Sequence, residues 1–171
     1  MQISEAPKTP TEARLIQIND GAIGTKDTLK LMRRLVRDGK KSIVVRNAAL
    51  SLMYDVLQKD YLNEIKRIHN FVQNEIRYIR DINEVETLQT PEKSLEIKQG
   101  DCDDKSTLAA AMLESVGHPT RFVAAGYGKG DFQHVWVETK YGNQWVPLEC
   151  TEPVPLGWKA PGMKEFLIIN N

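Results

Sequence analysis

The 171-residue sequence has only two cysteines, and it contains no apolar run long enough to span a membrane. Two cysteines do not make a disulfide framework, so we expect both to be free thiols in a reducing compartment. The N-terminus also lacks a basic segment followed by an apolar one, which is the pattern of a secretory signal. The sequence therefore predicts a cytoplasmic protein that does not bind membranes.

The sequence also lacks an excess of charge of either sign. Its 23 basic and 23 acidic residues give a formal net charge of zero, which argues against nucleic-acid or membrane-surface binding that depends on bulk charge. Basic residues do cluster between Lys30 and Arg46, but the neutral total favours a solvated helical face there. We therefore predict no nucleic-acid partner.

The remaining composition, 41% hydrophobic and 27% charged, is that of an ordinary globular protein. The length is sufficient for one core without disulfide or metal cross-links. We expect an N-terminal helical segment over residues 1–58, a core over residues 59–157 and a C-terminal tail over residues 158–171, all in one globular unit. The predicted fold class is α+β, with helices first and an antiparallel β-meander after them.

Apolar periodicity and capping residues predict four helices in the first two thirds of the chain. They run from Thr25 as N-cap through Asp38, from Ile43 or Val45 to Leu57, from Asp60 as cap through Arg80, and from Thr107 to Val116. The other segments are expected to be a loose terminus at 1–10, an extended piece at 16–19, a loop at 20–24 and a long loop at 81–99, which contains Pro91.

The last third carries strand patterns. The expected strands are Thr120–Tyr127, Phe132–Thr139 and Gln144–Cys150, which form two successive hairpins, and a short closing strand at Leu167–Ile169. Pro147 lacks a backbone N–H, so its strand is predicted to lie at an edge or to be bulged.

One thiol stands where a helix is expected to begin, in the segment Gly-Asp-Cys-Asp-Asp-Lys-Ser at residues 100–106. Unpaired backbone N–H groups and the helix dipole favour negative charge there, and the thiolate is the nucleophilic form of cysteine. The neighbouring aspartates oppose ionisation of Cys102, so a nearby imidazolium would have to lower its pKa. The same segment also suits a small buried hydrophobe at a helix cap, and this alternative stays open.

The second hairpin brings an imidazole and a carboxylate to one face. Alternation puts His134 on the same face as Trp136 and Glu138. A loop at Tyr141-Gly142, or over residues 140–143, sets His134 directly opposite Glu149, whereas a loop at Gly142-Asn143 makes the two diagonal neighbours. Both registers allow a hydrogen bond. Cys102, His134 and Glu149 would then supply a nucleophile, a base and a carboxylate that orients the base.

A metal site and an oxyanion hole are the other kinds of site that the sequence could form. A zinc site of Cys102, His134 and Cys150 is disfavoured, since there is no Cys-x-x-Cys and Cys150 should face away as a buried hydrophobe; no metal or cofactor is predicted. The backbone N–H of Cys102 is one candidate oxyanion donor. A second donor stays open, with candidates Gln73, Tyr78 and Gln133, and the helical His69 is expected at the surface.

Three motifs in order, Gly-Asp-Cys-Asp-Asp-Lys-Ser, His-Val-Trp-Val-Glu and Trp-Val-Pro-Leu-Glu-Cys-Thr, resemble the transglutaminase-like superfamily over roughly residues 60–153. The resemblance implies a circularly permuted papain-like core and a thiol acyl-transfer centre, with Cys102 as nucleophile and His134 as base. The third residue of the family is usually an aspartate, and Glu149 stands at that position here. Residues 24–49 resemble the leading segment of phage- and prophage-associated members.

The predicted function is cysteine-dependent acyl transfer on an amide bond through a thioester. Hydrolysis, as by a protease or amidase, is favoured because one compact domain lacks the accessory domains of dedicated cross-linking enzymes. The alternatives are transglutaminase-type cross-linking and a non-catalytic binding or assembly module. The expected partners are a peptide or protein substrate with an amide or isopeptide bond and, from the phage resemblance, phage structural proteins.

Overall fold

The computed structural model describes residues 21–80, 87–130 and 132–171. The expectations for residues 1–10 and 16–19 lie outside these ranges, as do Asp20 of the first predicted loop and the start of the loop at 81–99. No helix among the described residues is long and apolar enough to cross a membrane.

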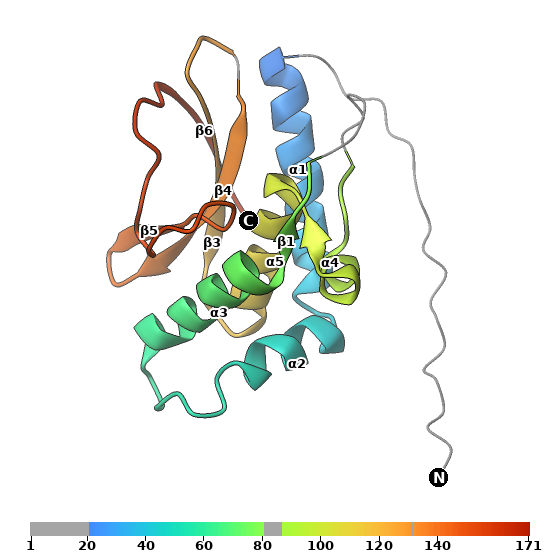
Figure 1. Ribbon diagram of the computed structural model, residues 1–171, viewed down its shortest axis with the longest axis vertical. Coiled ribbons are helices and arrows are strands. Elements are labelled where there is room, and N and C mark those ends of the chain that lie inside the picture. Colours follow the sequence, from blue (N-terminus) through green and yellow to red (C-terminus); the bar gives the residue numbers. More distant parts are fainter. Residues whose placement is uncertain (1–20, 81–86, 131) are drawn as a thin grey trace.

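A helical layer covers one face of an antiparallel sheet, as Figure 1 shows, so the α+β prediction is confirmed. The helices are α1 (Gly21–Gly39), α2 (Ile43–Ser51), α3 (Tyr61–Glu75), α4 (Pro91–Ile97) and α5 (Cys102–Ser115). The four-stranded sheet contains β3 (Thr120–Gly126), β4 (His134–Tyr141), β5 (Gln144–Leu148) and β6 (Glu165–Asn170) in the order β5-β4-β3-β6. A separate parallel pair contains β1 (Arg77–Tyr78) and β2 (Gln99–Gly100).

Helix α5 is the centre of the molecule. Nearly all of its residues are buried, because other helices pack on one side of it and the sheet packs on the other. The main core joins its apolar residues to the inward face of β3 and β4, which carries Phe122, Val135 and Val137. This packing fixes the N-terminus of α5 against the start of β4.

The start of α1 and the end of α2 differ from their predicted positions. Helix α1 already begins at Gly21, because Thr25 bonds back to the Gly21 carbonyl (3.2 Å) within the helix instead of capping it. Helix α2 ends at Ser51 rather than Leu57. Leu57 remains 77% exposed, so no core contact supports further helical turns there.

The long predicted helix is shorter, and the long predicted loop contains structure. Asp60 caps α3 as expected, but the helix ends at Glu75, since the following residues pair with β2. Pro91 is not a sign of a loop but the first residue of α4. Thr90 caps this helix by accepting from the Lys93 N–H, and proline is well tolerated at that position.

The sheet agrees with the predicted meander. β4 pairs with β5 so that Tyr141 faces Gln144, which makes Gly142-Asn143 the loop; Gly142 adopts a positive φ of 59°. Pro147 lies on the edge strand β5, as predicted. The closing strand is longer than expected and pairs with β3 along its whole length.

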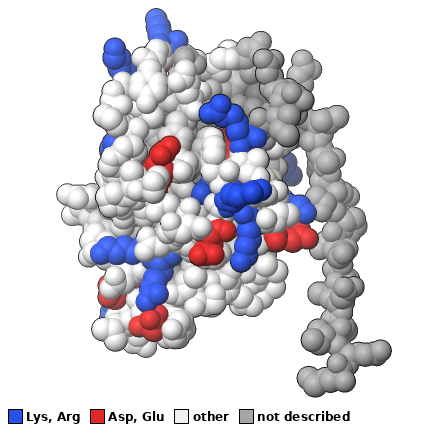
Figure 2. Space-filling view, in the orientation of Figure 1, with Lys and Arg blue, Asp and Glu red and all other residues white. Residues whose placement is uncertain are grey.

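Charges of both signs are interspersed on the molecular face in Figure 2, among a majority of uncharged side chains. This distribution agrees with the net charge of zero and gives no large field of one sign on this face.

Candidate active site

Cys102 is the first residue of α5, and a capping box builds this helix terminus. The Asp101 carboxylate accepts hydrogen bonds from the Asp103 N–H (2.9 Å) and the Asp104 N–H (3.1 Å), while Asp104 accepts from the Asp101 N–H (3.4 Å). Two donors that a helix start leaves without partners are satisfied in this way. The helix therefore begins at Cys102, five residues before the predicted Thr107.

The turn before the cysteine requires glycine. A Cβ atom on Gly100 would lie 2.5 Å from the Cβ atom of Asp104, a separation that real Cβ atoms do not show. Asp104 cannot easily move away, because both the backbone and the side chain of Gln89 donate to its carboxylate at 2.8 Å. The close approach of Gly100 to α5 thus fixes the path of the chain into Cys102.

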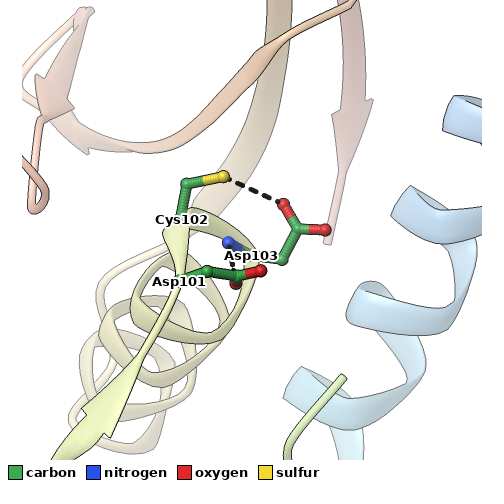
Figure 3. Close-up of side chains that lie close together, drawn as sticks. All are labelled: Asp101, Cys102 and Asp103. Carbon is green, nitrogen blue, oxygen red and sulfur yellow. Dashed lines mark hydrogen bonds between the residues drawn. The ribbon is translucent and has the colours of Figure 1, made fainter. Parts of the chain in front are cut away.

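The Cys102 thiol is partly buried and donates to Asp103 Oδ1 at 3.4 Å, as Figure 3 shows. Burial raises the pKa of the Cys102 thiol far above its ordinary value, and the charges of Asp103 and Asp101 raise it further. The sequence predicted a thiolate favoured by an imidazolium. Burial and the two carboxylates oppose this, because they disfavour a negative charge on the sulfur.

The thiol lies beside the start of β4. A backbone hydrogen bond with Val135 lowers the pKa of Cys102, and the Ser106 hydroxyl donates to the Val135 carbonyl at 3.3 Å. Val135 directly follows His134 in the chain. Cys102 and His134 do not form a hydrogen bond with each other in the described part of the chain, since the thiol bonds to Asp103.

His134 and Glu149 meet as the hairpin register predicts, with 2.6 Å between His134 Nε2 and Glu149 Oε2. The observed loop selects the diagonal alternative, and Glu149 lies one residue beyond the end of β5. Burial alone would raise the pKa of Glu149, but hydrogen bonds from His134 and Thr151 and the charge of His134 hold it below its ordinary value. A buried carboxylate thus stays ionised and orients the imidazole.

The Trp136 ring lies beside the imidazole of this His134–Glu149 pair. Its ring centroid lies 6.0 Å from that of His134, and its indole nitrogen donates to Glu138 (3.4 Å). Trp136 is buried in a small cluster with Val123 and Ala125, separate from the main core.

His69 is the clearest error of the sequence prediction, because it is buried rather than at the surface. Its Nε2 lies 2.7 Å from the backbone carbonyl of Glu149. The sequence did contain a signal, since His69 follows Ile65 by four residues and precedes Val72 by three. This spacing is that of the buried face of α3.

Of the three candidates for a second oxyanion donor, Gln73 is unsuitable, because its amide nitrogen already donates to the carbonyls of Glu149, Glu152 and Val154. Tyr78 pairs with Gly100, two residues before Cys102. Burial raises the pKa of Tyr78, a hydrogen bond with Arg80 opposes this, and the electrostatic interactions with Cys102 and Asp101 raise it further. The Tyr78 hydroxyl therefore lies in the electrostatic environment of the thiol.

The described residues include one candidate group of metal ligands. One group of three, Asp101, Cys102 and Asp103, has ligand atoms within 4.8 Å of one another. Its Asp101 carboxylate is already committed to the capping box. Cys150, the third member of the disfavoured zinc set, is buried, and burial raises the pKa of its thiol to about 12.

Replacing Asp103 with asparagine is expected to make Cys102 easier to ionise, since Asp103 raises the thiol pKa by its charge and by accepting its hydrogen bond. A unit charge about 4 Å away contributes on the order of 1 kcal/mol even in water. The pH profile of Cys102 alkylation by iodoacetamide should therefore move about one unit toward lower pH. Asp103→Glu, which keeps the charge, is the control, and an unmoved profile in Asp103→Asn would contradict this electrostatic account.

Known proteins are similar to this chain in family and in fold. A family model described as the transglutaminase-like superfamily matches residues 51–150. A "putative protease" from Parabacteroides distasonis is similar in structure, with a TM-score of 0.58 and 15% identity over 74% of this chain and 26% of that one. A "putative cysteine protease" from Cytophaga hutchinsonii has a TM-score of 0.54 and 18% identity over 74% of this chain and 46% of that one. No curated protein matches the sequence.

The two structural neighbours show a shared fold. This chain spans less than half of the length of either protein, and at 15% and 18% identity the likeness extends to the arrangement of helices and strands alone.

Proposed function

The chain belongs to the transglutaminase-like superfamily, and from this membership we propose that it is a cysteine-dependent acyl-transfer enzyme that cleaves an amide bond in a peptide or protein. The observation that carries the proposal is the 2.6 Å pair of His134 and Glu149, next in the chain to the Val135 backbone that contacts the Cys102 thiol. A nucleophile, a base and an orienting carboxylate are the groups that acyl transfer requires.

In the proposed reaction, His134 removes the thiol proton while the Cys102 sulfur attacks the amide carbon. The carbon–nitrogen bond then breaks, the leaving amine takes the proton from His134, and a thioester remains on Cys102. Water, deprotonated by His134, attacks the thioester, releases the carboxylic acid and restores the thiol. Because burial and the flanking carboxylates raise the pKa of the thiol, His134 acts here as a general base at the moment of attack.

The negative oxygen of each tetrahedral intermediate needs hydrogen-bond donors. The backbone N–H of Cys102 is the first donor, since the N–H of the first helical residue has no acceptor within the helix. The Tyr78 hydroxyl is the proposed second donor, because β1 and β2 pair Tyr78 with Gly100 next to the capping box.

The test is to incubate the protein with an unfolded protein substrate and a fluorescent primary amine. Hydrolysis would release new peptide termini, and cross-linking chemistry would attach the amine to the substrate; mass spectrometry distinguishes the two. The expected result is hydrolysis with acylated Cys102 as an intermediate, both absent in Cys102→Ala. Amine incorporation in place of hydrolysis would support the transglutaminase alternative.

A binding or assembly module is the second candidate. The hydrogen bond between the thiol and Asp103, and the raised pKa of Cys102, favour it because both keep the nucleophile protonated. If neither product forms and Cys102 reacts with iodoacetamide no faster than the buried Cys150, the proposal of catalysis is wrong and the binding module is favoured.

A further inference from the structure

A polar cluster of the buried His69 and the partly buried Gln73, on the C-terminal half of α3, contacts the segment that carries Glu149. His69 Nε2 is 2.7 Å from the Glu149 carbonyl oxygen. The Gln73 amide nitrogen contacts the same oxygen at 3.1 Å, and it also contacts the carbonyls of Glu152 (2.6 Å) and Val154 (2.8 Å). One helix turn thus holds three carbonyls of the segment that follows β5.

Lys105 connects this turn of α3 to the helix that begins with Cys102. Its side chain is 1% exposed, and Nζ donates to the carbonyls of Ile76 (2.6 Å) and Gln73 (3.3 Å). These carbonyls lie at the C-terminal end of α3, where a helix leaves acceptors without internal partners and where its dipole favours a cation. Lys105 therefore ties α3 to α5 three residues after the proposed nucleophile.

The protonation of His69 follows from its partners. The Glu149 carbonyl can only accept, so Nε2 must carry the proton and donate. Burial lowers the pKa of His69, which favours a neutral ring with a single proton. The Gln73 nitrogen, 3.4 Å from His69 Nε2, is then a second donor and does not bond to it. Both side chains thus direct their protons to the segment of Glu149.

We propose that His69, Gln73 and Lys105 form a positioning cluster that holds the Glu149 backbone so that its carboxylate faces His134. The need for such a cluster comes from the sheet, because Glu149 lies beyond the last paired residue of β5 and the strand ladder does not fix it. The inference rests on the proposed function, in which the orientation of His134 controls attack by Cys102.

The test measures Cys102 alkylation by iodoacetamide from about pH 5 to pH 9, a range that spans the free and activated thiol. Gln73→Met keeps the side-chain length but removes both amide protons, and we expect the rate at pH ~7 to fall about tenfold and its pH profile to move. Asn74→Met is the matched control, since the Asn74 amide is on the exposed side of the same helix turn and donates, among the residues that the structure describes, to the Asn70 carbonyl. It should behave as wild type.

A second pair of variants separates positioning from packing. His69→Gln retains a donor that can reach the Glu149 carbonyl and should preserve the rate, whereas His69→Leu fills similar space without a donor and should slow it. Cys150 is 2% exposed, so its alkylation in the same sample reports unfolded protein. The cluster inference fails if His134→Ala slows alkylation while Gln73→Met and His69→Leu keep the wild-type rate and pH profile. If His134→Ala leaves the wild-type rate unchanged, the proposed function itself fails.

Discussion

Replacing His134 with alanine is expected to slow alkylation of Cys102 at pH ~7 by roughly 100-fold, the low end of what a positioned general base contributes. A thiol with an ordinary pKa of ~8.5 is only about 3% ionised at this pH. Burial and the carboxylates of Asp103 and Asp101 raise the pKa of Cys102 further, so without a base the thiol should be nearly inert. The measurement is the rate of carbamidomethylation of the Cys102 peptide, followed by mass spectrometry.

The chain offers a matched control in a second histidine–glutamate pair. His118 Nε2 lies 2.7 Å from Glu64 Oε2, and His118 follows the C-terminal end of α5, whereas Cys102 begins that helix. Removing His118 costs a comparable histidine–carboxylate contact without touching the proposed centre, so His118→Ala should keep the wild-type rate for Cys102. Equal rates in wild type and His134→Ala would remove the general-base role.

The sequence predicted the His134–Glu149 contact because strand alternation and a two-residue turn leave few possible registers. Both registers open to the sequence put the two side chains on one face, and the turn decided between them. Gly142 adopts a left-handed conformation that costs glycine little, which selects Gly142-Asn143 as the loop. Local sequence patterns were therefore sufficient to predict the contact between His134 and Glu149.

The end of α3 could not be predicted from local patterns. Ile76 and Ile79 continue the helical period, so nothing in the sequence near them signals a stop. The helix ends because Arg77 and Tyr78 pair with Gln99 and Gly100, residues more than twenty positions later. A short pairing of this kind depends on tertiary structure, which overrides local propensity.

The electrostatics of the thiol and the role of His69 were missed for the same reason. The acidic neighbours of Cys102 were visible in the sequence, but burial, the largest cause of its raised pKa, depends on how α5 packs against the sheet. His69 bonds to a backbone carbonyl eighty residues away. Any residue type supplies a backbone carbonyl, so no sequence motif marks that partner.

Replacing Glu149 with aspartate, the residue usual in the family, is expected to slow Cys102 alkylation at pH ~7 at least tenfold rather than restore a better site. The change shortens the side chain by one carbon–carbon bond, about 1.5 Å, and the present hydrogen bond to His134 is 2.6 Å long. The backbone cannot advance to compensate, because His69 and Gln73 hold the Glu149 carbonyl. The shorter carboxylate would therefore no longer form its hydrogen bond with the His134 imidazole.

Glu149→Gln separates length from charge in this experiment, since its amide oxygen can still reach His134 but carries no negative charge. Glu149 has a lowered pKa in the folded state, so the ionised carboxylate stabilises the fold above its unfolded pKa of about 4.3 and this contribution is lost as pH falls through the folded value. The difference in unfolding free energy between wild type and Glu149→Gln should narrow over that acidic range in urea titrations. An alkylation rate of Cys102 in Glu149→Asp that equals or exceeds the wild-type rate would contradict this account. It would show that the diagonal register does not require the longer side chain and that the backbone held by His69 and Gln73 can shift.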